Sequence, residues 1–193
     1  GRMSGIWLVR HGMLPPNPER RMVGARDIPL SDAGREQIRL LARQFMPEVQ
    51  GALGAVICSD LDRCRETAAL LMEALPHGRP SLHVEPGLRE IDLGLWQGMT
   101  KAEIERAWPG AYAARGQDMA NFCPPQGESF MQAQRRALAA VARWRRLYPG
   151  VTLLMVSHAG ILGSLLAHYL ALPLRDVLRI PQYYGCRAFV PEW

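Results

Sequence analysis

Two short apolar runs of this chain each lead into a histidine. Residues 6–9 run into Arg10 and His11, and residues 151–156 run into His158 by way of a serine. A short apolar run rich in β-forming residues is typical of a buried strand. A guanidinium group binds phosphate or carboxylate, and an imidazole acts as a nucleophile or proton carrier near neutral pH. The two strand ends therefore predict an anion site that contains reactive histidines.

Further polar residues follow predicted strands or lie close after them. Ser59 follows the apolar run at residues 55–58, and Ser59-Asp60 is the expected cap of the next predicted helix. Arg63 falls in the first turn of that helix. Asn17 lies in the long loop that follows His11. The segments after the carboxyl ends of parallel strands meet at one edge of a sheet, where helix N-termini also favour phosphate. We therefore expect one shared site made of Arg10, His11, Asn17, Ser59, Arg63 and His158.

Glu90 is the best candidate for the acid that protonates a leaving oxygen. It lies in the turn-rich stretch of residues 88–94 between apolar neighbours, and an apolar setting favours the protonated form of a carboxyl group. Asp92 is the alternative acid, but we interpret it as a turn residue. The remaining histidines follow no predicted strand end, and we expect them to be surface or structural residues: His77, His83 and His168.

Apolar runs and amphipathic stretches alternate along most of the chain. The clearest helix begins after the capping residue Ser31 and has Ile38, Leu41 and Phe45 on one face. Strands that alternate with helices in this way form a mostly parallel sheet. The expected strands are residues 6–9, 55–58, 81–84, 151–156 and 186–190, and the expected helices are residues 31–46, 61–75, 128–148 and 161–172.

Residues 86–126 differ from the rest of the chain. Proline, glycine and tryptophan interrupt the periodicity there, which predicts one or two short helices, such as residues 100–108. A chain of 193 residues is long enough for one substantial core. We therefore interpret residues 1–193 as a single domain, with a cap or lid inserted at about residues 86–126.

The composition favours a globular enzyme that handles anions. Hydrophobic residues make up 48% of the chain, and the formal net charge is +5. Lys101 is the only lysine, and the arginines are spread along the chain without a long basic run. Nucleic-acid binding is therefore less favoured than a pocket for a phosphorylated or carboxylated small molecule.

Cysteine usage and hydropathy exclude several other classes. The four cysteines form no C-x-x-C pair and no cluster with histidines, so neither a zinc site nor a disulfide scaffold is expected. No apolar run has the length of a signal-peptide core or of a membrane span. We therefore expect a cytoplasmic protein that is not associated with a membrane.

The chain resembles the histidine phosphatase superfamily, the phosphoglycerate mutase-like proteins. The stretch Leu8-Val9-Arg10-His11-Gly12 is similar to the signature of that family, and residues 58–68, which contain Arg63, are similar to its second arginine motif. The further matches, in the order of the family, are Asn17, Gly24, residues 27–31, Gly34, residues 88–90, Gly94, Trp96, Gly98, residues 127–129 and residues 156–160. The resemblance covers nearly the whole chain, and this ordered set is more specific than any single motif.

The resemblance implies a three-layer αβα sandwich and phosphatase chemistry that uses no metal or other cofactor. His11 would be the nucleophile that accepts the phosphoryl group, and Glu90 would donate a proton to the leaving alcohol and later act as a base. The phosphoryl oxygens would be held by Arg10, Arg63 and His158, with help from Asn17. The chain is most similar to the small phosphatases of the family, such as α-ribazole phosphatase. That similarity implies a small phosphate ester as its partner and leaves a homodimer open.

The chain departs from the family directly after Gly12. The family usually has an acidic or amide residue there, followed by a small hydroxyl residue, whereas residues 13–16 are Met-Leu-Pro-Pro. An apolar and stiff loop thus replaces a polar lining beside the nucleophile. The nucleophile is unaffected, but the departure leaves the identity of the substrate open.

Other functions remain as alternatives. A cofactor-dependent phosphoglycerate mutase ranks second, because such mutases are usually longer. A non-catalytic module that binds a phosphorylated ligand would be expected to lack the nucleophile or the acid, yet this chain has both His11 and Glu90. A serine hydrolase is disfavoured, because Ser157 and His158 are adjacent and no G-x-S-x-G motif is present.

Overall fold

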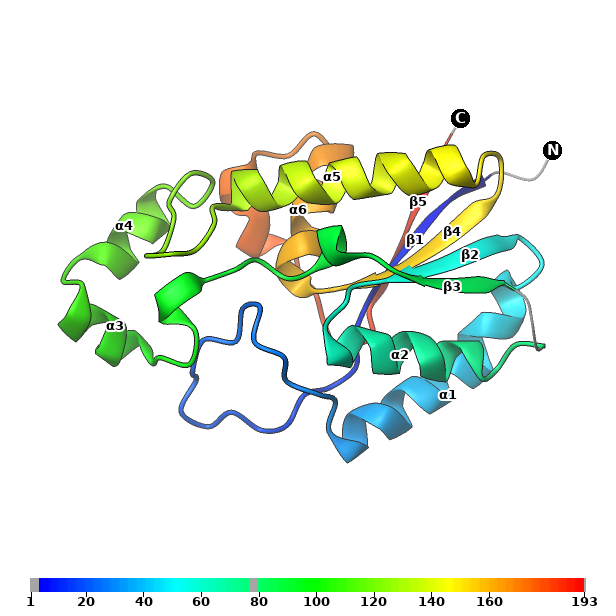
Figure 1. Ribbon diagram of the computed structural model, residues 1–193, viewed down its shortest axis with the longest axis horizontal. Coiled ribbons are helices and arrows are strands. Elements are labelled where there is room, and N and C mark those ends of the chain that lie inside the picture. The colour runs from blue at the N-terminus through cyan, green and yellow to red at the C-terminus, as the bar shows by residue number, and fades with distance from the viewer. Residues whose placement is uncertain (1–3, 77–79, 193) are drawn as a thin grey trace.

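A five-stranded sheet between two pairs of helices forms the body of the computed structural model, which describes residues 4–76 and 80–192 (Figure 1). The strands are β1 (Ser4–Arg10), β2 (Leu53–Cys58), β3 (Ser81–Val84), β4 (Thr152–Ser157) and β5 (Arg187–Glu192). The helices are α1 (Asp32–Val49), α2 (Asp62–Met72), α3 (Lys101–Ala107), α4 (Ala111–Gln117), α5 (Phe130–Leu147) and α6 (Ala159–Tyr169). Short 3₁₀ helices are η1 (Pro86–Leu88), η2 (Gly94–Trp96) and η3 (Leu174–Arg179).

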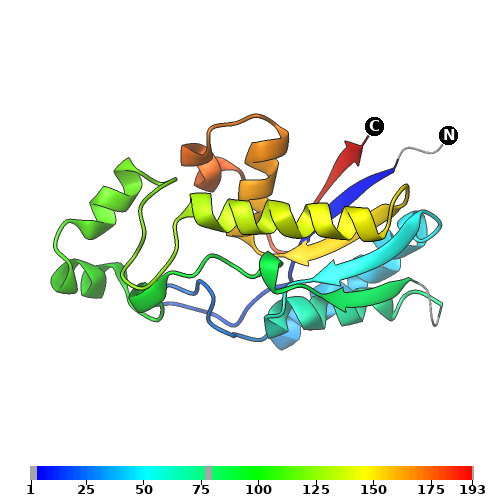
Figure 2. The same cartoon turned by 45° about the horizontal axis from the view of Figure 1, so that its top comes forward.

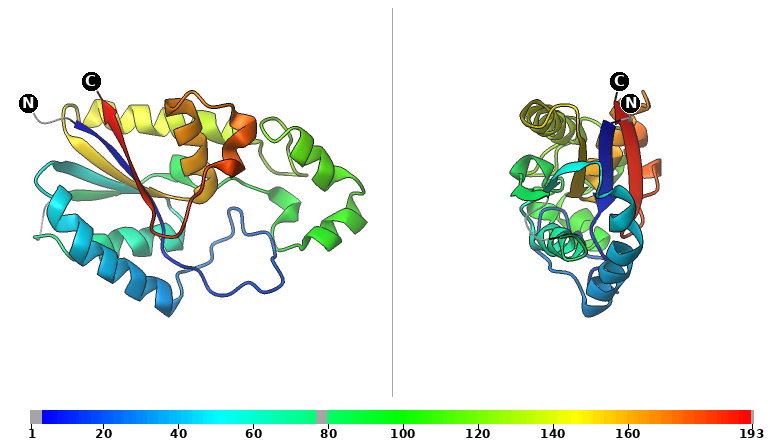
Figure 3. Two further views of the ribbon diagram at one scale, coloured as in Figure 1. Left: turned by 180° about the vertical axis from the view of Figure 1, so that it is seen from behind. Right: turned by 90° about the vertical axis from the view of Figure 1, so that its right-hand side faces the viewer.

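The strand order is β3-β2-β4-β1-β5, and only β5 runs antiparallel to its neighbour. Helices α1 and α2 cover one face of the sheet, and α5 and α6 cover the other, as the end-on view in Figure 3 shows. A mostly parallel sheet with a helical layer on each face confirms the expected αβα sandwich. β5, which corresponds to the strand expected at residues 186–190, forms the edge beside β1.

Alternation along the strands builds a separate core on each face of the sheet. On one face Ile57 and Met155 pack with residues of α5 and α6, such as Phe130 and Ile161. On the other face Val156 and its neighbours pack with residues of α1 and α2. The central strands are buried on both faces, which explains why their sequences are continuous apolar runs. The rigid sheet then fixes where its carboxyl ends lie.

The starts of α1 and α2 show one confirmed prediction and one error. Ser31 caps α1 as predicted, because its hydroxyl accepts a hydrogen bond from Gly34 N. The predicted cap of α2 at Ser59 is wrong. The helix begins at Asp62, and the carboxylate of Asp27, from the distant loop, accepts the hydrogen bond of the Asp62 N–H at 2.7 Å. The Ser59 hydroxyl accepts a hydrogen bond from Leu61 N, just before the helix, and also makes a contact in the site described below.

Residues 86–126 form the segment that carries η1, η2, α3 and α4. Figure 2 shows α3 and α4 beyond the end of the sheet, away from its strands. The predicted helix at 100–108 is present as α3, which Thr100 and Glu103 cap reciprocally. Fully buried Trp96 stacks on Tyr112 of α4 and anchors that helix to the rest of the fold. Within residues 4–76 and 80–192, no helix has both the length and the apolar character needed to cross a membrane.

Candidate active site

The carboxyl ends of β1, β2 and β4 meet at one edge of the sheet, as the sequence predicts. His11 N donates to Ser157 O, and Ser59 N donates to Val156 O, so these strand ends lie in register. The rings of His11 and His158 consequently lie 5.3 Å apart, centroid to centroid. His11 lies just past the last residue of β1, so the alternation of side chains along the strand does not constrain it.

The hydrogen bonding of His11 defines which ring nitrogen can react. Its Nδ1 lies 2.8 Å from the carbonyl oxygen of Gly12. Because a carbonyl oxygen only accepts, Nδ1 carries the proton and Nε2 keeps a free lone pair. Burial, followed by the charges of Arg10 and Arg63, lowers the pKa of His11 from 6.5 to about 3, although the Gly12 hydrogen bond acts in the opposite direction. The ring is therefore neutral, with a free lone pair on Nε2, throughout the physiological range.

We expect His11 to stay neutral in mildly acidic solution. As the pH falls from 6.5 toward 3, the unfolded chain binds a proton at this ring that the folded chain does not bind. The stability that His11 contributes is therefore full above pH 6.5 and is lost progressively as the pH falls toward 3. In ¹⁵N spectra assigned with a His11→Asn variant, His11 should keep the shifts of a neutral ring at pH 5. A protonation midpoint above pH 5 would contradict the expectation.

Two guanidinium groups flank the His11 ring. Arg63 is almost fully buried, and its Nη1 and Nη2 donate to the carbonyl oxygens of Arg26 and Gly24 at 2.5 and 2.8 Å. Arg10 lies over the ring of Tyr184 at 4.2 Å and donates from Nη1 to a backbone carbonyl. The Nε atoms of both arginines are buried and have no hydrogen-bond partner among the described residues. Since buried donors are normally paired, these N–H groups are suited to bind an anion beside His11.

His158 is completely buried next to this pair of arginines. Its Nε2 lies 2.8 Å from the hydroxyl of Ser59 and 3.4 Å from Sγ of Cys64, and these contacts fix the orientation of the ring. Burial, followed by the charge of Arg63, lowers the pKa of His158 well below 6.5. A second neutral imidazole therefore faces His11 across the site.

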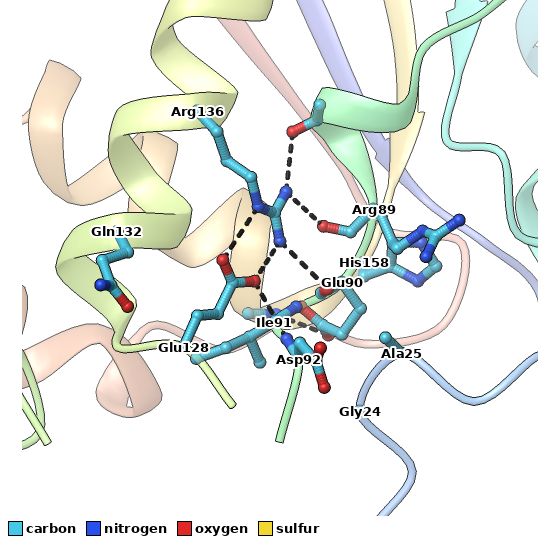
Figure 4. Close-up of polar contacts among 12 residues, drawn as sticks. Gly24, Ala25, Arg89, Glu90, Ile91, Asp92, Glu128, Gln132, Arg136 and His158 are labelled. Carbon is cyan, nitrogen blue, oxygen red and sulfur yellow. Dashed lines mark hydrogen bonds and ion pairs between the residues drawn. The ribbon is translucent and has the colours of Figure 1, made fainter. Parts of the chain in front are cut away.

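The Glu90 carboxylate lies at the N-terminus of α6, close to His158 (Figure 4). Its Oε2 accepts a hydrogen bond from Gly160 N at 3.1 Å, and its Oε1 accepts one from Ile91 N at 2.9 Å. Only glycine allows this approach at position 160, since a Cβ there would lie 2.7 Å from Oε1. The alternative acid, Asp92, accepts a hydrogen bond from Gly94 N and is a turn residue, as interpreted from the sequence. The fold thus directs Glu90 toward the histidines.

Asn17 has a different environment from the other predicted site residues. Its Oδ1 accepts from Arg21 N at 3.0 Å and its Nδ2 donates to Arg21 O at 2.8 Å, so the amide closes a loop. In the described part of the chain, no hydrogen bond joins Asn17 to His11 or His158. Its predicted role toward phosphate remains a prediction.

A C-terminal segment that the sequence did not assign to the site lies directly against His11. Gly185 N donates to His11 O, and Cys186 O accepts from Arg10 N. The ring of Tyr184 lies 5.8 Å from that of His11. Residues 182–186 have neither an apolar period nor a recognisable motif, so no local signal marks them.

Thr67 is a second residue that sequence reasoning missed, although a signal for it exists. Its hydroxyl donates to Arg63 O, one helical turn earlier, and accepts from Gly12 N at 3.1 Å. Thr67 therefore connects α2 to the turn after His11. The spacing of four residues from Arg63 puts both on one face of a helix, which was the available clue.

The other histidines lie apart from this cluster. His83 packs against Trp144 at a ring separation of 4.7 Å, and His168 is exposed on α6. Both agree with the expectation of structural or surface residues. His77 lies outside the described residues.

A cavity of about 250 Å³ adjoins the site. Apolar groups from the loop after His11 form much of its lining, together with Tyr184: Leu14, Pro15, Pro16, Val23 and Ile28. Arg26, whose carbonyl oxygen binds Arg63, also lines it, as does Asn17. The apolar loop that the sequence shows after Gly12 therefore forms a wall of a cavity that adjoins the site.

Comparisons with known proteins agree with this geometry. The model of the histidine phosphatase superfamily (branch 1) matches residues 6–190. The glucosyl-3-phosphoglycerate phosphatase of Mycolicibacterium vanbaalenii is 34% identical over 180 residues, which cover 90% of this chain and 77% of the relative. The adenosylcobalamin/alpha-ribazole phosphatase of Salmonella typhimurium is 31% identical over 182 residues, covering 94% and 87%.

A solved structure extends the agreement to three dimensions. The alpha-ribazole phosphatase from Shigella flexneri superposes with a TM-score of 0.82 at 26% sequence identity, covering 95% of this chain and 88% of that one. The match of the family model runs from β1 to β5 and includes both histidine-bearing strand ends. The sequence resemblance is thereby confirmed, and the chain belongs to the histidine phosphatase superfamily, branch 1.

Proposed function

We propose that this protein is a phosphomonoesterase that hydrolyses a small phosphorylated metabolite through a phosphohistidine on His11. One observation carries the proposal: a buried, neutral His11, with its free lone pair on Nε2, lies between two arginines. Phosphoryl transfer requires an in-line nucleophile and fixed positive charge around the transferred oxygens. The buried Nε donors of Arg10 and Arg63 supply that charge.

In the first step, His11 Nε2 attacks phosphorus and the bond from phosphorus to the ester oxygen breaks. Arg10, Arg63 and His158 bind the phosphoryl oxygens during the transfer, and Asn17 assists from the loop. Glu90, in its protonated form, gives its proton to the leaving alkoxide, so that the alcohol departs neutral. The proton on Nδ1 of His11 stays on that nitrogen, hydrogen-bonded to Gly12 O, throughout.

In the second step, water attacks the phosphorus of the phosphohistidine, and the bond from phosphorus to Nε2 breaks. The Glu90 carboxylate accepts the proton of that water and is thereby returned to its acid form. Inorganic phosphate leaves, and His11 regains the lone pair on Nε2. Each side chain is thereby restored to its starting state, and one water is consumed for each phosphate released.

We propose that the alcohol part of the substrate occupies the 250 Å³ cavity. The cavity supports an alcohol with an apolar or aromatic portion, because Leu14, Val23, Ile28 and Tyr184 contribute to its lining. The curated relatives differ in the alcohol their names specify, a glucosylated phosphoglycerate in one and α-ribazole in another. α-Ribazole phosphate, whose alcohol includes an aromatic base, fits the apolar lining better.

A panel of phosphate esters tests the function and the preference together. With α-ribazole phosphate, sugar phosphates, phosphoglycerates and nucleotides, we expect release of inorganic phosphate. The esters with an apolar or aromatic alcohol should give the highest kcat/KM. Burial of about 60 Å² of apolar surface is worth about 1.5 kcal/mol, or about tenfold in kcat/KM. A uniform kcat/KM across the panel would contradict the role of the cavity.

The same protein preparation distinguishes the alternatives. A phosphoglycerate mutase would interconvert 2- and 3-phosphoglycerate in the presence of bisphosphoglycerate and release no phosphate from any ester. A non-catalytic module would bind the esters and turn over none of them. Either result would overturn the proposed phosphatase activity.

We extend the proposal to the organisation and surroundings of the protein. Residues 86–126 act as a cap over a single catalytic domain, supported by the position of α3 and α4 beyond the end of the sheet. The partner is a small phosphate ester and not a nucleic acid, and the compartment is the cytoplasm. A homodimer is the assembly to test, by sedimentation of the purified protein.

A further inference from the structure

Glu90 lies in a segment that has no regular secondary structure to hold it. It belongs to the five residues between η1, which ends at Leu88, and η2, which begins at Gly94. Its carboxylate is only partly buried, and no strand ladder or helix fixes its backbone. A general acid must nevertheless be held close to its productive geometry to be effective. Other residues must therefore hold this segment.

The guanidinium group of Arg136, on α5, holds the segment from one side (Figure 4). Nη1 donates to the carbonyl oxygens of Gly87 and Arg89 at 2.9 and 2.8 Å. Nη2 donates to the carbonyl oxygen of Glu90 itself at 3.1 Å. The planar fork of one arginine thus binds three carbonyl groups of the segment, a geometry that a lysine ammonium cannot reproduce.

Glu128 binds the part of the segment that follows Glu90 in the sequence. Its Oε1 accepts from Arg136 Nη2 at 2.5 Å and also from Asp92 N at 3.0 Å. The backbone N–H of Glu128 donates to Asp92 O at 2.8 Å. Backbone groups on both sides of Glu90 are therefore bound by the same ion pair, whose side chains are only 28% and 20% exposed.

A rigid helix supports this ion pair. Ala133, Ala137 and Ala140 of α5 pack in the core, so Arg136 is displayed from a helix that is fixed against the sheet. Because this face of α5 is buried, the helix backbone that carries Arg136 is restrained, and the movement of the guanidinium group is restricted. Glu90 and His11 are therefore both held in place relative to the same sheet.

We propose that Arg136, paired with Glu128, is a positioning residue for Glu90. It holds the backbone of residues 87–92 so that the Glu90 carboxyl group meets the ester oxygen of the substrate. This inference rests on the proposed function, in which Glu90 is the general acid. Arg136 itself touches no reacting atom, and its effect is transmitted through the carbonyl groups it binds.

The dependence on the leaving group separates positioning from mere structural support. An alkyl alkoxide is strongly basic and needs a proton as it leaves, whereas 4-nitrophenolate leaves without one. A displaced Glu90 therefore slows alkyl esters selectively. The quantity kcat/KM covers the steps up to formation of the phosphohistidine, so later hydrolysis does not affect it. A general loss of folded protein or of phosphate binding lowers kcat/KM for both esters equally.

The experiment compares an alkyl phosphate with 4-nitrophenyl phosphate for Arg136→Ala and Arg136→Lys. Misplacement of a catalytic group by about 1 Å costs about 10²-fold. For both variants we expect a loss of up to about 10²-fold in kcat/KM on the alkyl ester, and a change of less than about threefold on the aryl ester. Arg136→Lys retains the charge beside Glu128 and supports the test if the alanine variant does not fold. Arg135→Ala, at an exposed neighbouring position of α5, is the matched control and should behave as the wild type.

Glu90→Gln, assayed in parallel, makes the outcomes distinct. If Glu90→Gln is selective for the alkyl ester but the Arg136 variants lose both esters equally, or neither, the positioning role is overturned and the function of Glu90 stands. If Glu90→Gln is not selective, Glu90 is not the acid, and this inference fails with that assignment. A fall in the thermal unfolding temperature without the selective loss marks a purely structural role for Arg136 and also overturns the proposal.

Discussion

The variant His11→Ala is expected to lose at least about 10⁴-fold in kcat on every phosphate ester, because no other group in the site can take the phosphoryl group. His158 cannot replace it, since its Nε2 is engaged with the hydroxyl of Ser59. Without the nucleophile the enzyme is not only slower but also cannot form the covalent intermediate. The expected effect is therefore qualitative as well as large.

Trapping of the intermediate measures this prediction directly. The wild type, mixed with a ³²P-labelled phosphate ester and denatured at alkaline pH, where the bond from phosphorus to nitrogen survives, should carry label on His11. His11→Ala should carry none. His168→Ala, which changes an exposed histidine at the far end of α6, is the control and should label fully. Label that persists in His11→Ala would identify a different nucleophile and refute the proposed mechanism.

The second large effect is expected for Glu90→Gln. The amide keeps the shape of the side chain but cannot donate an acidic proton, so kcat/KM on an alkyl phosphate should fall by about 10²- to 10⁴-fold. With 4-nitrophenyl phosphate the first step should proceed, and hydrolysis of the phosphohistidine should be slow because the base is also missing. A burst of 4-nitrophenol equal to the enzyme concentration, followed by slow turnover, is the expected trace.

Asp92→Asn provides the matched control for this carboxylate. The asparagine oxygen can still accept the hydrogen bond of Gly94 N that Asp92 accepts, so the turn is preserved. We expect Asp92→Asn to retain activity on both esters. If Asp92→Asn reproduces the alkyl-selective loss and Glu90→Gln does not, the two roles have been assigned to the wrong carboxylates.

The central part of the site could be predicted from sequence because local patterns encode it. The apolar run at residues 6–9 identifies a buried strand, and alternation with helices identifies a parallel sheet. In such a sheet the strand ends converge, so His11 and His158 were predicted to share an edge although 147 positions separate them in the sequence. This prediction needed only the general rule that the carboxyl ends of parallel strands converge, and no knowledge of a particular contact.

Prediction was weaker where no period or cap signals an element. Ser59-Asp60 was expected to cap α2, but Asp27 binds the first N–H of the helix from a loop 35 residues away, and the Ser59 hydroxyl also contacts His158. Similarly, the loop of residues 13–16 was recognised as apolar, but its role as a cavity wall depends on Tyr184 from the other end of the chain. Contacts between irregular segments follow from the assembled fold and not from local spacing.

The sequence by itself determined the strand-end motifs Arg10-His11-Gly12 and His158 and the order of strands and helices along the chain, and it led to the prediction that Glu90 is the acid. Only the tertiary structure decided that Nδ1 of His11 is occupied by Gly12 O, that Asn17 closes a turn, and that Arg136 holds the Glu90 segment. The physical reason is that apolar periodicity specifies buried elements. Hydrogen bonds to backbone carbonyls depend instead on where irregular segments lie once those elements have packed.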